Sequence, residues 1–234
     1  PAAPFPADAY FELHIEQGPV LEAAGVTIGA VTQSCHSAFT DAVCHGETSH
    51  IQSTPMPQRR NALWGAARLI DAIERTGFAH APDGTASAVV IDAWPNNRIV
   101  LPSHAGFSYG VMHLEEDGLA AMVAAIDASA EAIAAETGLR FETVLRRVRR
   151  PFHFAEELVA LTEGVARDLG HSVTRMRTRP GHDAFNMVAL CPTALIFVPC
   201  RDGLSHNEAE WCEPAHCTAG AAVLAEAVLR RAER

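Results

Sequence analysis

Apolar residues in the middle of the chain recur at intervals typical of helices and strands. Across residues 59–75 they fall three and four positions apart, which predicts an amphipathic helix. The same spacing predicts a second helix over residues 117–138. Short apolar or alternating runs predict extended segments at 27–46, 87–94, 106–114 and 140–149. In the last of these, arginines alternate with apolar residues, so we expect an edge strand with a solvated basic face.

The order of these segments indicates a fold. Strand, helix, strand, strand, helix, strand is the split βαβ or ferredoxin-like plan, which we assign to residues 30–150. After Pro151, the pattern predicts helices over 155–169 and 214–231, and a continuous apolar run over 194–200 predicts a buried parallel strand. This tail is too small for a complete α/β layer. Its missing strands are expected in residues 1–29 or outside the chain, which gives three pieces: 1–29, 30–150 and 151–234.

Composition excludes several classes of protein. A hydrophobic share of 48% in 234 residues supports a buried core and excludes general disorder. The formal net charge of −10 argues against nucleic-acid binding. Asp, Glu or Gly interrupts every apolar run before the roughly 20 residues of a membrane helix, so no membrane association is expected. Six scattered cysteines without a C-x-x-C pair favour reduced thiols and a cytoplasmic location.

Two short segments carry candidate chemistry. Residues 12–18 contain His14 at the end of an apolar stretch, and residues 202–210 contain His206 in the loop after the apolar strand. Loops at the carboxyl ends of α/β strands commonly hold ligands, and a neutral imidazole binds zinc through one nitrogen. Taken alone, each histidine is more often structural, and two histidines do not complete a catalytic zinc site. Cys212, His216 and Cys217 match no standard zinc spacing, so a structural role is favoured there.

Five landmarks in order along the chain carry a family resemblance. They are the segments 10–22 (YFELHIEQGPVLE), 49–56 (SHIQSTPM), 59–63 (RRNAL), 181–184 (GHDA) and 196–210 (IFVPCRDGLSHNEAE). Together they resemble the C-terminal part of the amidase/hydantoinase/carbamoylase branch of the M20 metallopeptidase-like hydrolases. The resemblance implies an incomplete zinc-hydrolase α/β catalytic domain with an inserted ferredoxin-like βαββαβ lid and dimerisation domain.

The resemblance also implies roles for individual residues. His14 and His206 would each bind a metal, with zinc expected first and Mn, Co or Ni as alternatives. Gln17, His182 and Asn96 would contact a small-molecule substrate, and His50 would stabilise the anion formed when hydroxide attacks the scissile carbon. A surface histidine beside a turn is the alternative for His50. A loop-capping His-Asp pair is the alternative for His182. The lid would form a homodimer.

Several departures from the family pattern complicate this function. The family's His-x-Asp and Glu-Glu segments, which supply further metal ligands and the general base, would precede residue 14 and have no counterpart here. Ile99 and Met112 stand where the family has Asn and Arg that hold a substrate carboxylate, which indicates a substrate without one, or an inactive member. The sequence therefore predicts a metal-dependent hydrolase of linear amide C–N bonds, on N-carbamoyl or ureido-type substrates. The alternative is an inactive paralogue or fragment that acts as a dimerisation or small-molecule-binding module, and the isolated chain is expected to be inactive.

Overall fold

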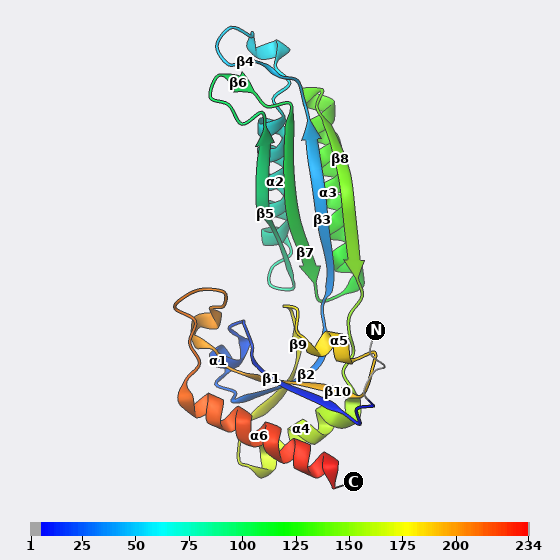
Figure 1. Cartoon of the computed structure of the whole chain (residues 1–234), viewed down its shortest axis with the longest axis vertical. Coiled ribbons are helices and arrows are strands. Elements are labelled where there is room, and N and C mark those ends of the chain that lie inside the picture. Colours follow the sequence, from blue (N-terminus) through cyan, green and yellow to red (C-terminus); the bar gives the residue numbers. More distant parts are fainter. Residues whose placement is uncertain (1–5, 234) are drawn as a thin grey trace. The chain divides into compact units, whose positions relative to one another are not determined.

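The computed structural model describes residues 6–233 and divides into two compact units (Figure 1). Unit 1 contains the chain up to Ser34 and from Pro151 onward, and unit 2 is Cys35–Arg150. The sequence places the first boundary between residues 29 and 30. In the structure, residues 28–34 form a strand paired within the sheet of unit 1, so the boundary follows Ser34.

Unit 1 is built on a mixed sheet of four strands within the described residues. Its order is β1 (Tyr10–Ile15), β10 (Thr193–Val198), β2 (Ile28–Ser34) and β9 (Val173–Thr178). Strand β10 runs parallel to β1 and antiparallel to β2, and β2 runs parallel to β9. All six residues of β10 are buried, which confirms the buried strand expected from its continuous apolar run.

Helices cover both faces of this sheet. Helices α4 (Glu156–Asp168) and α6 (Pro214–Ala232), both predicted from sequence, pack on one face around a core that includes Ile196 and Val223. Two short helices, α1 (Val20–Ala24) and α5 (Ala184–Met187), lie with the core on the other face, which includes Phe197. A 3-10 turn over Arg201–Gly203 follows β10. Because helices cover both faces, polar side chains can gather at the strand ends and along the half-buried edge strand β1.

Unit 2 confirms the ferredoxin-like plan. Its elements follow in the order β3 (His36–His45), α2 (Ala62–Ala79), β5 (Gly84–Trp94), β7 (His104–His113), α3 (Glu116–Thr137) and β8 (Arg140–Arg149). The sheet order is β5-β7-β3-β8 with every neighbour antiparallel, so β8 is an edge strand as predicted. A small ribbon of β4 (Ser49–His50) and β6 (Val100–Leu101) and a 3-10 turn at Met56–Gln58 complete the unit.

Only one face of the unit 2 sheet carries helices, as Figure 1 shows. Alternate residues of β3, among them Ala38 and Ala42, are buried under α2 and α3, whereas Phe39 between them is 54% exposed on the other face. Of the described helices, α3 alone is long and apolar enough to cross a membrane by length and composition, which corrects the expectation that no segment approaches that limit. Its residues Met122 and Ile126 are buried in the unit 2 core, so we assign it as a core helix.

Candidate functional site

The two sequence segments that carry candidate chemistry meet at one edge of the unit 1 sheet. Strands β1 and β10 are parallel and in register, with Ile15 opposite Val198, so the loops that follow them begin side by side. The Gln17 side-chain amide donates a hydrogen bond to Ser205 Oγ at 2.7 Å, which joins the two loops directly. Gly203 lies so close to this turn that a Cβ atom on it would stand 2.6 Å from the carbonyl carbon of Gly18.

Backbone strain is concentrated in these loops. Gln17, Asp202 and His206 are the non-glycine residues with positive φ among those the structure describes, at 57°, 57° and 55°. Left-handed backbone is unfavourable for such residues and persists only where neighbouring contacts enforce it. The contacts are visible here, since the Asp202 N–H donates to Glu22 at 2.6 Å and the His206 N–H donates to Glu210 at 3.2 Å.

Glu16 is a structural residue whose role no motif in the sequence indicates. Its buried carboxylate accepts hydrogen bonds from the backbone N–H groups of Val20, at 2.9 Å, and Leu21, at 2.7 Å. These are free N–H groups at the start of α1, and a carboxylate there also interacts favourably with the helix dipole. An acidic residue just before a short helix is the sequence feature that could have indicated this capping role. Glu16 thus fixes the turn that carries Gln17.

His14 presents one ring nitrogen for binding. Its Nδ1 lies 2.8 Å from the carbonyl oxygen of Ile15, so Nδ1–H donates to that oxygen in the neutral ring. The proton is then on Nδ1, and Nε2 keeps a free lone pair, as a metal-binding histidine requires. The ring is half-buried at the end of β1.

The structure brings His182 against His14. Their rings meet edge to face with centroids 4.7 Å apart. The His182 side chain is fully buried, and its Nε2 lies 2.8 Å from Thr178 Oγ1. Burial, aided by His14, lowers the pKa of His182 to about 4, so the ring is neutral. Glu12 Oε1 lies 3.8 Å from Nδ1, too far for a hydrogen bond, and Nδ1 has no other partner among the described residues.

The capping interpretation of the His182–Asp183 pair needs a correction. The side chain of Asp183, at the start of α5, makes no capping hydrogen bond. Glu12 caps instead: its carboxylate accepts the Ala184 N–H at 2.6 Å and the Tyr10 hydroxyl at 3.2 Å. Burial and the nearby Glu12 carboxylate raise the pKa of Tyr10. His182 is therefore a wall of the site beside His14, and the helix start depends on Glu12.

The metal-binding potential of these residues is partial. His14 has a suitable free nitrogen, and His206 is exposed in the opposing loop. Within residues 6–233, however, no three His, Cys, Asp or Glu side chains gather closely enough to hold a metal ion. A catalytic zinc usually takes three protein ligands, so the described residues do not complete a site. At the Cys212 cluster, burial raises the thiol pKa to about 12, which opposes the thiolate form that binds metal.

The remaining candidates, His50 and Asn96, lie in unit 2. His50 is exposed on β4, and its Nδ1 accepts hydrogen bonds from the backbone N–H groups of Gln52, at 3.1 Å, and Ser53, at 3.2 Å. The proton of the neutral ring is consequently on Nε2, which points a donor away from the turn. Asn96 is exposed in the loop between β5 and β6. Ile99, 58% exposed, lies beside His50, because its carbonyl accepts the Ile51 N–H at 3.0 Å.

Comparison with known proteins gives consistent matches along the whole chain. The sequence profile of peptidase family M20/M25/M40 matches residues 2–230. The chain is 36% identical over 225 residues to the N-carbamoyl-L-amino-acid amidohydrolase of Rhizobium meliloti, covering 96% of this chain and 54% of that protein. It is 30% identical over 204 residues to the allantoate amidohydrolase of Escherichia coli K12, covering 86% of this chain and 49% of that protein.

A solved structure extends the likeness to three dimensions. The crystal structure of an amidase of the hydantoinase/carbamoylase family from Burkholderia vietnamiensis matches with a TM-score of 0.91 and 39% identity. The match covers 99% of this chain and 56% of that one. The chain therefore spans about half the length of the relatives it matches.

Proposed function

The chain belongs to peptidase family M20/M25/M40, and from this membership we propose that it forms part of a metal-dependent amidohydrolase acting on linear amide C–N bonds. The proposed substrates are N-carbamoyl amino acids or ureido compounds, the class named in its relatives. The proposed location is the cytoplasm, on the cysteine pattern of the sequence.

One observation carries the proposal most directly. The loops after β1 and β10 are joined by the Gln17–Ser205 hydrogen bond at 2.7 Å, and His14 beside them keeps Nε2 free. A side-chain amide, a free imidazole nitrogen and a strained loop at one sheet edge form a binding site for a polar substrate. The buried neutral ring of His182 lines this site without placing a positive charge beside His14.

We propose that this chain supplies some of the ligands of a metal site. His14 and His206 would contribute imidazole ligands to a divalent ion, zinc in first place and Mn, Co or Ni as alternatives, with the other ligands lying outside the described residues. A bound divalent ion supplies Lewis-acid activation of water and of the scissile carbonyl. Gln17 would orient the substrate beside it.

His50 fits the role of oxyanion donor. Two backbone N–H groups occupy its Nδ1, so the neutral ring presents Nε2–H as a donor. A donor fixed in this tautomer stabilises negative charge on an attacked carbonyl oxygen without first gaining a proton. Asn96 would contribute a further contact to the substrate from the adjacent loop.

We propose that the substrate has an uncharged group near Ile99 and Met112 in place of a carboxylate. Ile99 is exposed beside His50, and Met112 is half-buried on β7. Neither side chain donates hydrogen bonds to a carboxylate, unlike the Asn and Arg expected at these positions. We therefore expect N-carbamoyl compounds with an uncharged end to be better substrates than N-carbamoyl amino acids.

Ammonia release by the full product of the gene, with divalent metal added, tests the function. We expect turnover of N-carbamoyl compounds that falls by about 10²–10³ in His50→Ala, the usual loss on removing one oxyanion donor. His153→Ala, an exposed histidine of unit 1, is the matched control and should leave turnover unchanged. Binding of these compounds without turnover would instead support an inactive binding module.

The unit 2 sheet also supports a homodimer. Both edges expose apolar residues, but those of β5 form an uninterrupted run, Val89, Val90 and Ile91, whereas Val144, Leu145 and Val148 of β8 are interspersed with arginines. An apolar edge strand favours pairing with another strand, and charges along an edge oppose it. The proposed dimer therefore pairs β5 with β5 of a second copy.

Sedimentation tests this pairing. Val90→Lys should shift the protein to monomer, and the matched β8 change Val148→Lys should not. A monomeric parent protein at micromolar concentration would contradict the dimer.

A further inference from the structure

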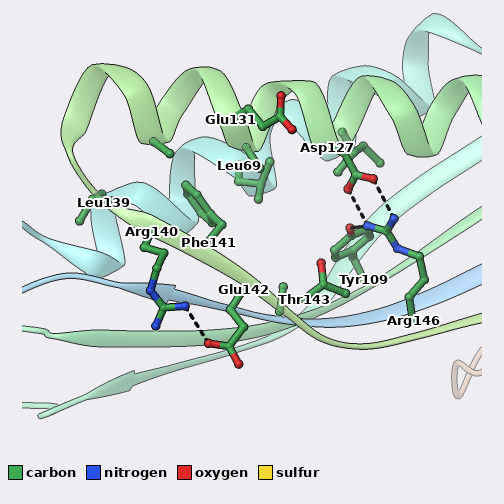
Figure 2. A pocket seen from close by; sticks show the side chains of 14 residues that line it. Leu69, Tyr109, Asp127, Glu131, Leu139, Arg140, Phe141, Glu142, Thr143 and Arg146 are labelled. Carbon is green, nitrogen blue, oxygen red and sulfur yellow. Dashed lines mark hydrogen bonds and ion pairs between the residues drawn. The ribbon is translucent and has the colours of Figure 1, made fainter.

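Unit 2 contains a cavity that none of the candidate residues discussed above lines. It has a volume of about 480 Å³ and lies between helix α3 and the edge strand β8 (Figure 2). Ala42 of β3, Leu69 of α2 and Tyr109 of β7 lie among its lining residues, together with side chains of α3 and β8. Clefts of 300–1,000 Å³ are typical of small-molecule sites.

The cavity exists because small residues face each other across it. Ile126, Ala130 and Ala134 form one stripe of α3 at intervals of four residues, and the alanines fill little of the space toward the sheet. Ala42 is similarly small on the opposite side. Phe141 and Leu69 supply larger apolar surfaces, so most of the interior is apolar and well suited to the body of an organic molecule.

An irregularity in β8 places a charged group at one end. The register shifts between Asp41 and Ala42, which pair with Leu145 and Thr143, so Val144 is an extra residue. Residues three apart in a regular strand point to opposite faces, and a bulge reverses that parity. Thr143 and Arg146 consequently both line the cavity, as Figure 2 shows.

Arg146 is fully engaged by groups of the protein. Its guanidinium donates two hydrogen bonds to the Asp127 carboxylate, at 2.8 and 2.6 Å, and lies 3.4 Å from the Tyr109 hydroxyl. The Asp127 hydrogen bonds raise the pKa of Arg146. This pair forms a neutral polar wall. Likewise, Arg140 pairs with Glu142 at 2.9 Å, and Glu142 also contacts His45 at 3.0 Å.

Glu131 leaves one negative charge uncompensated. It lies at the rim of the cavity one helical turn after Asp127, is exposed to solvent, and makes no hydrogen bond or ion pair among the described residues. With Asp127 and Glu142 each matched by an arginine, the lining charges sum to one negative charge, contributed by Glu131. An apolar interior with one free carboxylate at its exposed rim is complementary to a molecule that has an apolar body and one positive charge, with the weak attraction typical of an exposed ion pair.

We propose that this cavity is a binding site for a small protonated amine with an aromatic or branched apolar body. The body lies against Phe141, Leu69 and the alanine stripe, and the ammonium group faces Glu131 at the exposed rim. The Tyr109 hydroxyl and the Arg146–Asp127 pair close the polar end. The site is independent of the reaction proposed above, because it lies wholly within unit 2 and needs no metal.

Three probes of one shape and different charge test the proposal on the 234-residue chain. Phenethylamine, 2-phenylethanol and 3-phenylpropionate are titrated while chemical shifts are followed by NMR. We expect the amine to bind most tightly and the carboxylate most weakly, with the largest shifts at the residues that line the cavity on α2, α3, β3, β7 and β8. Glu131→Gln should weaken amine binding by about threefold to fivefold, the range of a part-exposed ion pair, and leave alcohol binding unchanged.

Substitutions that fill the cavity provide a second test of the proposal. Ala130→Leu should abolish binding of the amine and the alcohol, and Ala132→Leu, an exposed alanine of α3 outside the cavity, should leave both intact. Ala134→Leu fills the cavity from a second position if Ala130→Leu does not fold. Equal binding of all three probes, binding unaffected by the leucine substitutions, or absence of binding at millimolar probe would each overturn the proposal. None of these outcomes depends on hydrolytic activity.

Discussion

The two units place their polar chemistry differently because their sheets are covered differently. In unit 1, helices bury both faces of the sheet, and Glu12 and His14 of the edge strand β1 lie together with His182, which follows β9. In unit 2, helices cover one face, and polar groups spread over the open face and edge β8. A sheet buried on both sides therefore positions a few side chains tightly, and a sheet open on one side offers surfaces and grooves.

The largest expected difference concerns the same residue type in the two sheets. Phe197 in β10 is 1% exposed, and Phe39 in β3 is 54% exposed. Phe197→Ala leaves a cavity in a closed core and should lower the free energy of unfolding of unit 1 by about 3–5 kcal/mol. Phe39→Ala removes partly solvated surface and should cost less than about 1 kcal/mol in unit 2.

Hydrogen exchange measured separately for peptides of each unit checks this pair. We expect faster exchange throughout unit 1 in Phe197→Ala and little change in unit 2 in Phe39→Ala. Equal effects would mean that the open face of the unit 2 sheet is covered in solution, which would also bear on the proposed dimer.

The buried histidine of unit 1 gives the next largest effect, through pH. The pKa of His182 is about 4 in the folded state, below its ordinary value of 6.5. Between these values the unfolded chain binds more protons, so stability is complete above pH 6.5 and falls as the pH decreases toward 4. The loss at this site is roughly 3 kcal/mol.

Urea unfolding of the metal-free chain between pH 7 and pH 4 measures this dependence. His182→Gln should flatten the part of the profile between pH 6.5 and 4, and His153→Gln, exposed in the same unit, should not. An unchanged profile in His182→Gln would show that other groups dominate the acid sensitivity of unit 1.

The N-terminal caps of α1 in unit 1 and α2 in unit 2 give a smaller difference in stability. In unit 1, Glu16 caps α1 through two backbone N–H groups, one of them buried. In unit 2, Asn61 caps α2 by accepting from the exposed Leu63 and Trp64 N–H groups, at 3.1 and 3.4 Å. Glu16→Ala should cost about 2 kcal/mol, since a buried donor loses its partner, and Asn61→Ala about 1 kcal/mol. Thermal unfolding of both variants compares them, and a smaller loss in Glu16→Ala would contradict the assignment of its cap.

Local sequence patterns predicted the long helices and the ferredoxin-like order because repeated apolar spacing extends over many residues there. They did not identify β9 (VTRMRT), which has no apolar alternation and whose Arg175 pairs with Glu156 and Glu163 of α4, a tertiary contact. His14 stands in a segment that the sequence itself singles out and His182 was implied by the family resemblance, and neither source brings the two together. That contact depends on how β1, β10, β2 and β9 are ordered, which no local pattern encodes.

The smallest predicted effect tests whether the β8 bulge creates a functional difference between neighbouring arginines. The sequence predicts one solvated basic face for this strand. In the structure, Arg146 instead faces Asp127 on α3, whereas Arg147 is exposed opposite Phe39. Arg146→Ala removes a bidentate pair whose members remain partly solvated, so the cost should be only about 0.5–1 kcal/mol, and Arg147→Ala should change stability by less than that.

The sharper measurement is amine binding in the α3–β8 cavity. Without Arg146, Asp127 becomes a second free carboxylate, so the affinity for the amine should rise in Arg146→Ala. It should stay unchanged in Arg147→Ala. Weaker amine binding in Arg146→Ala would mean that the pair supports the shape of the cavity more than its charge.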